Sequence, residues 1–449
     1  NQLTFLEGSS GHIDSDLQIE SQKQDSSIVN IGGPFSIKTV KMEDLSLINP
    51  LQGNITSTID FSDKLLSVQQ CELEYEQNQG SLKGEINFNE LILFGIEFGF
   101  QIPELTELAN SLGLKMQPAG RALIEGNFYG SIEELETNAR FNLQEFSLQD
   151  YMLGELTGEL TYHKNNILIK TIELINQQTK LTGNGNILLN ESGLPEITLS
   201  YQLHTIDLNP LIQTFFSTLP LTGQVAGNGN IQGTWPELIT QGNLQLDQVF
   251  YQDYLLGKAE TDFVLQPGQD ILPEINGQEP DDLFNLIGHS YSLEIQNFTL
   301  QNETMKLEAE GQTEIGRNTP FSLAIDFSHQ NLNDMMEYFY PIDDNLQTYL
   351  PSQITGKANL SGSVSEQQLS LSAQLIPQQQ QNNPPSSLET EIVRNDSGFT
   401  ISDFRLIQSE GHFNANGNIS PAQDLDINFQ AEQLDMDSLM SLVQIDERM

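Results

Sequence analysis

The sequence contains very little cysteine. Among its 449 residues Cys71 is the only cysteine. A single cysteine excludes an intramolecular disulfide, and it gives no indication of the redox compartment. The fold that the sequence specifies therefore needs no disulfide framework.

Basic residues are also scarce. The chain has 18 Lys and Arg against 62 Asp and Glu, which gives a formal net charge of −44. Such a charge repels nucleic acid and anionic membrane surfaces, so no nucleic-acid partner is expected. The acidic residues are dispersed among Gln, Asn, Ser and Thr, which favours a solvated outer surface over a metal site.

Long apolar runs are absent, and no signal peptide opens the chain. No segment is long enough to span a bilayer as a helix. The first residue, Asn1, falls within a strand pattern, and the chain stops directly after a helical pattern. We therefore expect a fragment of a longer protein whose membrane anchor is missing.

The sequence contains no convincing catalytic constellation. Its six histidines are scattered, and none lies three to five positions from another, as a helical metal pair requires. The pairs Asp281-Asp282 and Asp343-Asp344 fall in polar loops, where solvated carboxylates are common. The sequence predicts a protein that is not an enzyme, with no catalytic residues, no metal and no cofactor.

The sequence does contain a recurring strand pattern in which apolar and polar residues alternate. Apolar or small residues occupy every second position of three similar stretches: Ala122, Ile124, Gly126, Phe128, Gly130; Val225, Gly227, Gly229, Ile231, Gly233; Ile354, Gly356, Ala358, Leu360, Gly362. This period is typical of a strand with one apolar and one polar face, and its recurrence is typical of a repeat protein. Each stretch is followed by further alternating strands.

A short helical pattern closes each unit, at residues 103–112, 207–216, 331–340 and 435–442. These patterns predict one continuous elongated body with four parts. The parts are a partial unit at 1–118, a unit at 119–220, a unit at 221–350 with a loop insertion at 266–290, and a unit at 351–449 with a Gln- and Pro-rich loop at 377–387.

The inward residues of these strands should form a continuous apolar stripe that must be covered. Strand parity assigns the following residues to it: Ile167, Ile169, Leu181, Ile187, Val225, Ile231, Leu244, Leu246, Leu300, Leu307, Phe413 and Phe429. Two arrangements satisfy the pattern. The sheet either closes on itself as a packed core, or it folds into a trough whose interior stays open for a long apolar ligand.

The segment 220–238 carries a resemblance that favours the second arrangement. The segment begins with Leu221-Thr222-Gly223, which is followed by an alternating strand, Gly233, a short turn and a further alternating strand from Gly242. This order is similar to the repeats of the AsmA-like superfamily, which includes the TamB and YdbH proteins. Weaker forms of the phrase occur at 119–120 and 354–356, and the resemblance covers the chain from about residue 53 to its end.

The resemblance implies an all-β fold, namely an elongated repetitive antiparallel sheet that curves into a U-shaped apolar groove, with short helices between the units. It implies a periplasmic protein of a diderm bacterium, held in the inner membrane by an N-terminal anchor. Such a protein would guide phospholipids between the inner and outer membranes and aid outer-membrane biogenesis. Its partners would be phospholipid acyl chains and an outer-membrane or periplasmic protein. The alternative is an extracellular or periplasmic β-repeat adhesin or scaffold with a closed core.

Overall fold

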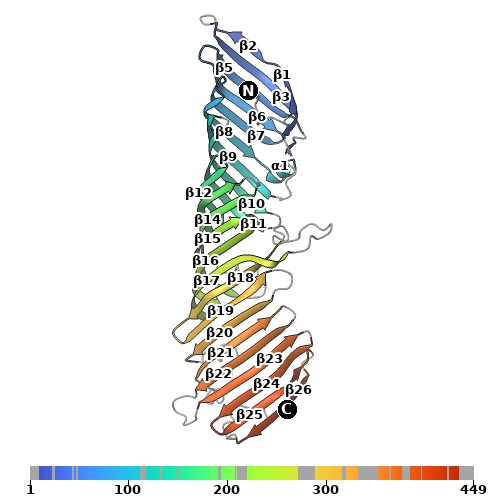
Figure 1. Ribbon diagram of the computed structural model, residues 1–449, viewed down its shortest axis with the longest axis vertical. Coiled ribbons are helices and arrows are strands. Elements are labelled where there is room, and N and C mark those ends of the chain that lie inside the picture. The colour runs from blue at the N-terminus through green and yellow to red at the C-terminus, as the bar shows by residue number, and fades with distance from the viewer. Residues whose placement is uncertain are drawn as a thin grey trace. The chain divides into compact units, whose positions relative to one another are not determined.

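The computed structural model describes residues 10–22, 26–42, 45–46, 49–111, 118–131, 134–148, 151–190, 194–207, 209, 220–271, 289–315, 320–331, 352–363, 366–376, 385–395, 397–421 and 424–433. These residues form 26 strands and one helix (Figure 1). The chain divides into two units, residues 1–203 with 232–235 and residues 204–231 with 236–449. Each unit is described by itself.

Unit 1 is an antiparallel meander. Its elements are β1 (Ser10–Ser15), β2 (Gln18–Ser21), β3 (Ile28–Met42), β4 (Leu45–Ser46), β5 (Leu51–Asp60), β6 (Leu65–Tyr75), β7 (Asn78–Asn87), β8 (Ile92–Ile102), α1 (Leu105–Ser111), β9 (Pro118–Ser131), β10 (Glu136–Leu148), β11 (Tyr151–His163), β12 (Asn166–Asn176) and β13 (Thr179–Leu189). Strand β3 pairs with β1, β2, β4 and β5. From β5 to β13 each strand then pairs with the next in the chain.

Unit 2 has the same plan. Its strands are β16 (Glu237–Tyr251), β17 (Tyr254–Ile271), β18 (His289–Gln301), β19 (Met305–Ile315), β20 (Phe321–His329), β21 (Gln353–Gly362), β22 (Gln367–Ile376), β23 (Ser386–Asn395), β24 (Gly398–Gln408), β25 (Gly411–Ile419) and β26 (Leu425–Glu432). Each pairs antiparallel with its successor. Two more strands, β14 (Pro195–Thr205) and β15 (Leu221–Thr234), lie where the residue ranges of the units meet.

In the part of the chain that the structure describes, each unit is an open meander. The first and last strands of each described meander do not pair with each other. This confirms an all-β protein built as an open antiparallel meander. The alternation of the sequence explains it, because β7 and β14 both switch between more and less exposed residues at nearly every position.

Tight turns with side-chain caps join neighbouring strands. Asp60 Oδ1 accepts hydrogen bonds from the backbone N–H groups of Ser62 and Asp63 after β5. Asn87 Oδ1 accepts from Asn89 and Glu90 in the same way after β7. Asp and Asn favour such turns because their side chains satisfy the backbone donors that the turn leaves free. The turns therefore fix the point at which the chain reverses.

The internal repeat is reproduced in backbone detail. Gly130 and Gly233, which lie 103 positions apart (233 − 130), both have a positive φ, of 98° and 135°. At the same separation, Glu145 and Gln248 adopt left-handed φ values of 54° and 53°. Glu145 and Gln248 each mark a bulge, because the pairing of β10 with β11 shifts register at Glu145 and that of β16 with β17 shifts register at Gln248.

Most of the expected helices and loops lie outside the described residues. Helix α1 falls inside the first helical pattern, at 103–112. The patterns at 207–216, 331–340 and 435–442 lie almost entirely outside the described residues. The loop insertion expected at 266–290 is strand at both ends, since β17 runs to Ile271 and β18 begins at His289. Of the loop expected at 377–387, residues 377–384 lie outside the described residues, and Ser386 and Ser387 belong to β23.

Candidate functional site

The pairing register of unit 1 gathers apolar residues on one face of the sheet. Residues that are direct cross-strand partners point to the same face. One such row crosses ten strands, from β3 to β13 without β4: Gly33, Ile55, Cys71, Leu82, Phe98, Gly126, Ala139, Leu160, Ile169 and Gly185. Every member of the row is apolar or glycine. We call this surface the apolar face of unit 1.

Unit 2 has an apolar face built in the same way. One row of direct partners runs from β16 to β26: Leu246, Ala259, Leu300, Leu307, Phe327, Gly356, Ala373, Leu388, Leu406, Phe413 and Ala431. No charged or amide side chain interrupts it. Within each unit the ladder thus converts a period of two in the sequence into a continuous apolar surface.

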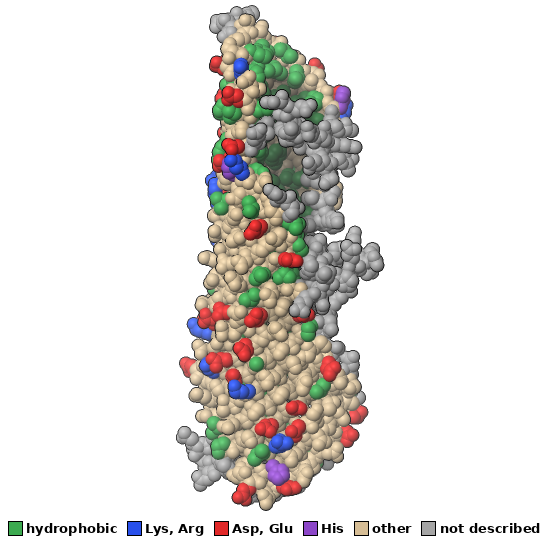
Figure 2. Space-filling model, viewed as in Figure 1, with side chains coloured by type: hydrophobic (Ala, Val, Ile, Leu, Met, Phe, Trp, Pro, Cys, Tyr) green, Lys and Arg blue, Asp and Glu red, His purple; other side chains and the backbone are tan. Residues whose placement is uncertain are grey.

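The apolar faces are only partly covered. In the described part of the chain, Thr205 is the largest side chain with less than 2% of its surface exposed. No Leu, Ile or Phe reaches that level there, whereas such residues commonly do in a packed protein core. The faces are most open at the edge strands, where Ile19 of β2 is 67% exposed and Phe429 of β26 is 73% exposed. Figure 2 shows hydrophobic side chains gathered over the N-terminal strands of unit 1.

Large and small residues alternate on these faces. A Cβ atom added at Gly126 would lie 2.6 Å from Cζ of Phe98, and one added at Gly158 would lie 2.5 Å from Cζ of Phe141. Each ring therefore lies over a glycine of the neighbouring strand, which keeps the ring low on the sheet. Phe98 also stacks on Phe128, with ring centroids 4.5 Å apart.

The opposite face of each sheet is polar and carries cross-strand ion pairs. Lys83 Nζ lies 2.8 Å from Glu97 in unit 1, and Lys357 Nζ lies 2.9 Å from Asp326 in unit 2. All four side chains are more than half exposed, so each pair contributes little to stability. These ion pairs do determine which face of the sheet is exposed to water, because charged side chains are costly to bury.

A hydrogen-bonded chain crosses the polar face of β9, β10 and β11. The hydroxyl of Tyr129 donates to the carboxylate of Glu136 over 2.8 Å, and the hydroxyl of Thr161 donates to Oδ1 of Asn138 over 2.6 Å. The amide of Asn138 donates in turn to the Tyr129 oxygen. The hydrogen bond to Glu136 raises the pKa of Tyr129, because it favours the protonated phenol. This network links the three strands β9, β10 and β11.

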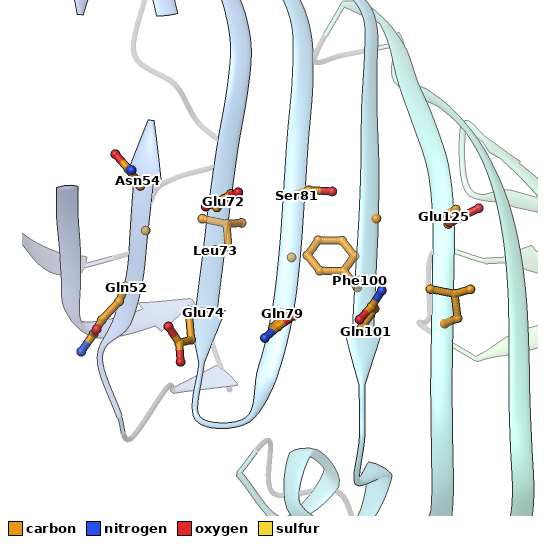
Figure 3. A pocket seen from close by; sticks show the side chains of 14 residues that line it. Gln52, Asn54, Glu72, Leu73, Glu74, Gln79, Ser81, Phe100, Gln101 and Glu125 are labelled. Carbon is orange, nitrogen blue, oxygen red and sulfur yellow. The ribbon is translucent and has the colours of Figure 1, made fainter. Parts of the chain in front are cut away.

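A depression of about 570 Å³ lies over β5 to β9 and is lined mainly by residues of the polar face (Figure 3). Amide, hydroxyl and carboxylate side chains supply most of its lining: Gln52, Asn54, Glu72, Glu74, Gln79, Ser81, Gln101 and Glu125. Cys71 and Leu82 are partners on the apolar face. Glu72 is the residue after Cys71 and Ser81 is the residue before Leu82, so both point to the opposite face. Gly53, Leu73, Gly80 and Phe100, which share strand parity with the apolar face, also line the depression.

The side chains that could bind a metal ion are dispersed in the described residues. No three or more His, Cys, Asp or Glu side chains are grouped there so that they could hold a metal ion. Burial raises the pKa of Cys71, which favours the unreactive thiol. A search for membrane-crossing helices within the same residues finds none that is long and apolar enough.

The structure places the residues assigned to the stripe as follows. Ile167, Ile169, Leu181 and Ile187 lie on the apolar face of unit 1, and Leu244, Leu246, Leu300, Leu307, Phe413 and Phe429 lie on that of unit 2. Val225 and Ile231 of β15 share strand parity with Gly227, whose added Cβ would meet the Leu244 side chain. Val225 is only 3% exposed. That these residues line a lipid groove stays a prediction.

Sequence reasoning missed the N-terminal part of the apolar face. Strand β3 contributes Val29, Ile31, Phe35 and Ile37 through its pairing with β5. The alternation of these residues around Gly33 was the signal that could have revealed them. Phe98 and Phe100 of β8 and Phe128 of β9 were also not assigned, although they lie on the apolar face.

Comparison with known protein families yields no matching family model, and no curated protein matches the chain. The fold and the faces define a class, an all-β repeat protein made of open antiparallel meanders with one apolar and one polar surface. The likeness to the AsmA-like superfamily rests on the repeat motifs alone.

Proposed function

We propose that the apolar faces bind phospholipid acyl chains and that the protein guides phospholipids between the inner and outer membranes of a diderm bacterium. The protein would work in the periplasm as a bridge. One observation carries the proposal. Apolar cross-strand partners run without interruption through each described meander, yet none of their Leu, Ile or Phe side chains is fully buried. A surface of this kind needs an apolar occupant.

The energetics of transfer support a passive guide. Each methylene group removed from water contributes about 0.8 kcal/mol, so a sheet face that curves around an acyl chain substitutes for the bilayer interior. Curvature into a U-shaped groove is part of the proposal. Glycines under the rings, such as Gly126 and Gly158, keep the rings low on the sheet and thin the side-chain layer on the face toward which it would bend. No bond is broken, so direction comes from a lipid gradient or an energised partner.

Native mass spectrometry of the chain produced in a bacterial periplasm tests the proposal. We expect several co-purifying phospholipids, and we expect Leu246→Asp to lose them, because the new carboxylate must be desolvated by a bound acyl chain. The matched control is Gln245→Asp, which places the same charge one residue away on the polar face. Circular dichroism verifies that both variants fold.

Photo-crosslinking provides the second arm of this test. A photoreactive amino acid at positions 244 and 246 should capture acyl chains, whereas the same group at 243 and 245 should not. This alternation follows from the strand geometry of β16. A folded wild-type protein free of lipid, with no alternation, would contradict the proposal and leave the scaffold or adhesin with a closed core.

A further inference from the structure

Two neighbouring turns of unit 1 have the same construction, and each exposes a phenylalanine. The turn after β5 reads Phe61-Ser62-Asp63-Lys64, and the turn after β7 reads Phe88-Asn89-Glu90-Leu91. Each turn ends on a residue with a left-handed φ, 57° at Lys64 and 53° at Leu91. Phe61 is 57% exposed and Phe88 is 38% exposed. The same aromatic tip therefore occurs twice in succession.

The two tips lie side by side. The backbone N–H of Phe88 donates to the carbonyl oxygen of Lys64 over 3.0 Å, and the Lys64 ammonium donates to Oδ1 of Asn89 over 3.3 Å. The rings of Phe61 and Phe88 meet edge to face, with their centroids 6.3 Å apart. The two rings thus form one exposed surface, which we call the Phe61–Phe88 patch.

Exposed phenylalanine is not a general feature of the turns that join these strands. Three other turns of unit 1 consist of exposed polar residues only: Glu76-Gln77 after β6, Lys164-Asn165 after β11 and Gln177-Gln178 after β12. A polar residue satisfies the geometry of such a turn equally well. The phenylalanines of the patch therefore call for a role other than chain reversal.

The patch continues the apolar face of unit 1. Phe61 comes two residues after Ile59, and Phe88 comes two residues after Ile86. Both isoleucines lie on the apolar face, because both are partners of Leu66. The outermost row of the face on this side is apolar throughout: Val29, Ile59, Leu66, Ile86 and Leu93. The patch and the face together form a continuous apolar path.

The backbone donors of both tips are already hydrogen-bonded within the protein. At each tip three consecutive N–H groups have acceptors. Those of residues 61–63 donate to the carbonyl oxygen of Ser27 and to Oδ1 of Asp60, and those of residues 88–90 donate to the carbonyl oxygen of Lys64 and to Oδ1 of Asn87. Backbone groups that leave water for a bilayer must be satisfied internally. These tips can therefore enter a bilayer interface without leaving those donors unpaired.

Charge decides which bilayer fits. The turns carry Asp63 and Glu90 against the single cation Lys64, and the chain as a whole has a net charge of −44. An anionic bilayer repels such a surface, whereas a zwitterionic bilayer does not. Aromatic side chains are favoured at the level of the lipid headgroups.

We propose that the Phe61–Phe88 patch contacts the surface of a zwitterionic phospholipid bilayer, and that lipid passes there between the bilayer and the apolar face of unit 1. The rings enter the interface while the polar residues of the turns stay among the headgroups. The passage of lipid rests on the proposed function, whereas the contact with the bilayer rests on the tips alone.

Flotation of the full chain with phosphatidylcholine vesicles tests the contact. We expect wild type to float with the vesicles, and we expect the double variant Phe61→Ser, Phe88→Ser to lose about tenfold or more of its binding, because two apolar rings no longer leave water. The matched control is Phe94→Ser. Phe94 is 51% exposed, but it lies on the polar face as the partner of Glu85, so its loss should leave flotation unchanged. Circular dichroism verifies the fold of each variant.

Three results would overturn the contact. They are a wild type that does not float, equal flotation of wild type and the double variant, and a wild-type dimer in sedimentation that the double variant dissociates, since a second copy would then cover the patch. Vesicles of phosphatidylcholine mixed with phosphatidylglycerol should bind more weakly at low salt. Stronger binding to them would overturn the choice of bilayer.

Uptake of a self-quenched fluorescent phosphatidylcholine from donor vesicles tests the passage of lipid. We expect the double variant to take up lipid more slowly but to the same final amount, because the apolar face is intact. An unchanged rate would overturn the passage and leave the proposed function standing. If wild type takes up no lipid but floats through the patch, the proposed function fails and the bilayer contact is supported.

Discussion

At the scale of single residues, glycine does two different things in this protein. Beneath the phenylalanine rings it supplies space, as Gly126 does for Phe98. At the bulges it supplies backbone freedom. Gly257 has a φ of 115°, and a Cβ atom there would lie 2.0 Å from the carbonyl oxygen of Gln301. Gly154 occupies the matching place one repeat earlier, and a Cβ atom added there would lie 2.2 Å from the carbonyl oxygen of Ile175.

This distinction predicts the effect of Gly257→Ala. The added methyl group collides with backbone that cannot move away without breaking the ladder, so we expect a loss of stability about 1–3 kcal/mol larger than for an unobstructed glycine. The control is Gly95→Ala, because Gly95 also has a positive φ, 64°, but has nothing within 4 Å of the added atom. Urea unfolding measures both. Equal losses for the two variants would show that φ alone sets the cost.

At the scale of elements, the free energy needed to open a strand locally rises with the number of neighbouring strands that it pairs with. Strand β23 pairs with both β22 and β24, whereas β26 pairs with β25 alone in the described residues. Local opening at an edge breaks one ladder and buries little, so it costs less free energy than opening inside the sheet. The meander therefore frays from its edges.

Hydrogen exchange should show this gradient. We expect the amides of β26 to exchange far sooner than those of β23, because the outer amides of β26 are already exposed to water. Mass spectrometry of peptides from the two strands makes the comparison within one experiment. Protection of β26 equal to that of β23 would mean that the outer edge of β26 is covered in solution.

At the scale of the whole molecule, the net charge of −44 works against folding. The surface ion pairs of the described residues, such as Lys83 with Glu97, are exposed and individually weak. They involve few of the 62 acidic residues. The remaining carboxylates repel one another over distances comparable to the Debye length.

Salt should therefore stabilise this protein. Raising sodium chloride from about 10 mM to about 150 mM shortens the Debye length from about 30 Å to about 8 Å, which screens the repulsion. We expect the midpoint of thermal unfolding to rise, measured by circular dichroism with potassium chloride as the matched salt. A fall would mean that the ion pairs outweigh the repulsion. Glu125→Gln, which removes one exposed carboxylate of β9, should raise the midpoint at low salt.

The sequence by itself determined that the protein is an antiparallel all-β meander and which residues of a strand share a face. A period of two is local, and it survives in any antiparallel pairing, so Ile169 and Leu307 could be placed without knowing their partners. The repeat spacing likewise located Gly130 and Gly233 at equivalent bends.

Only the tertiary structure decided which residues meet and how far the faces are covered. Bulges such as the one after Leu143 change the register, and no local pattern reveals how many residues a bulge absorbs. The placement of Phe98 over Gly126 joins residues that are distant in the chain, and it depends on the pairing of β8 with β9. Exposure of Phe429 depends on what lies beside β26, which is a property of the sheet edge and not of the strand's own sequence.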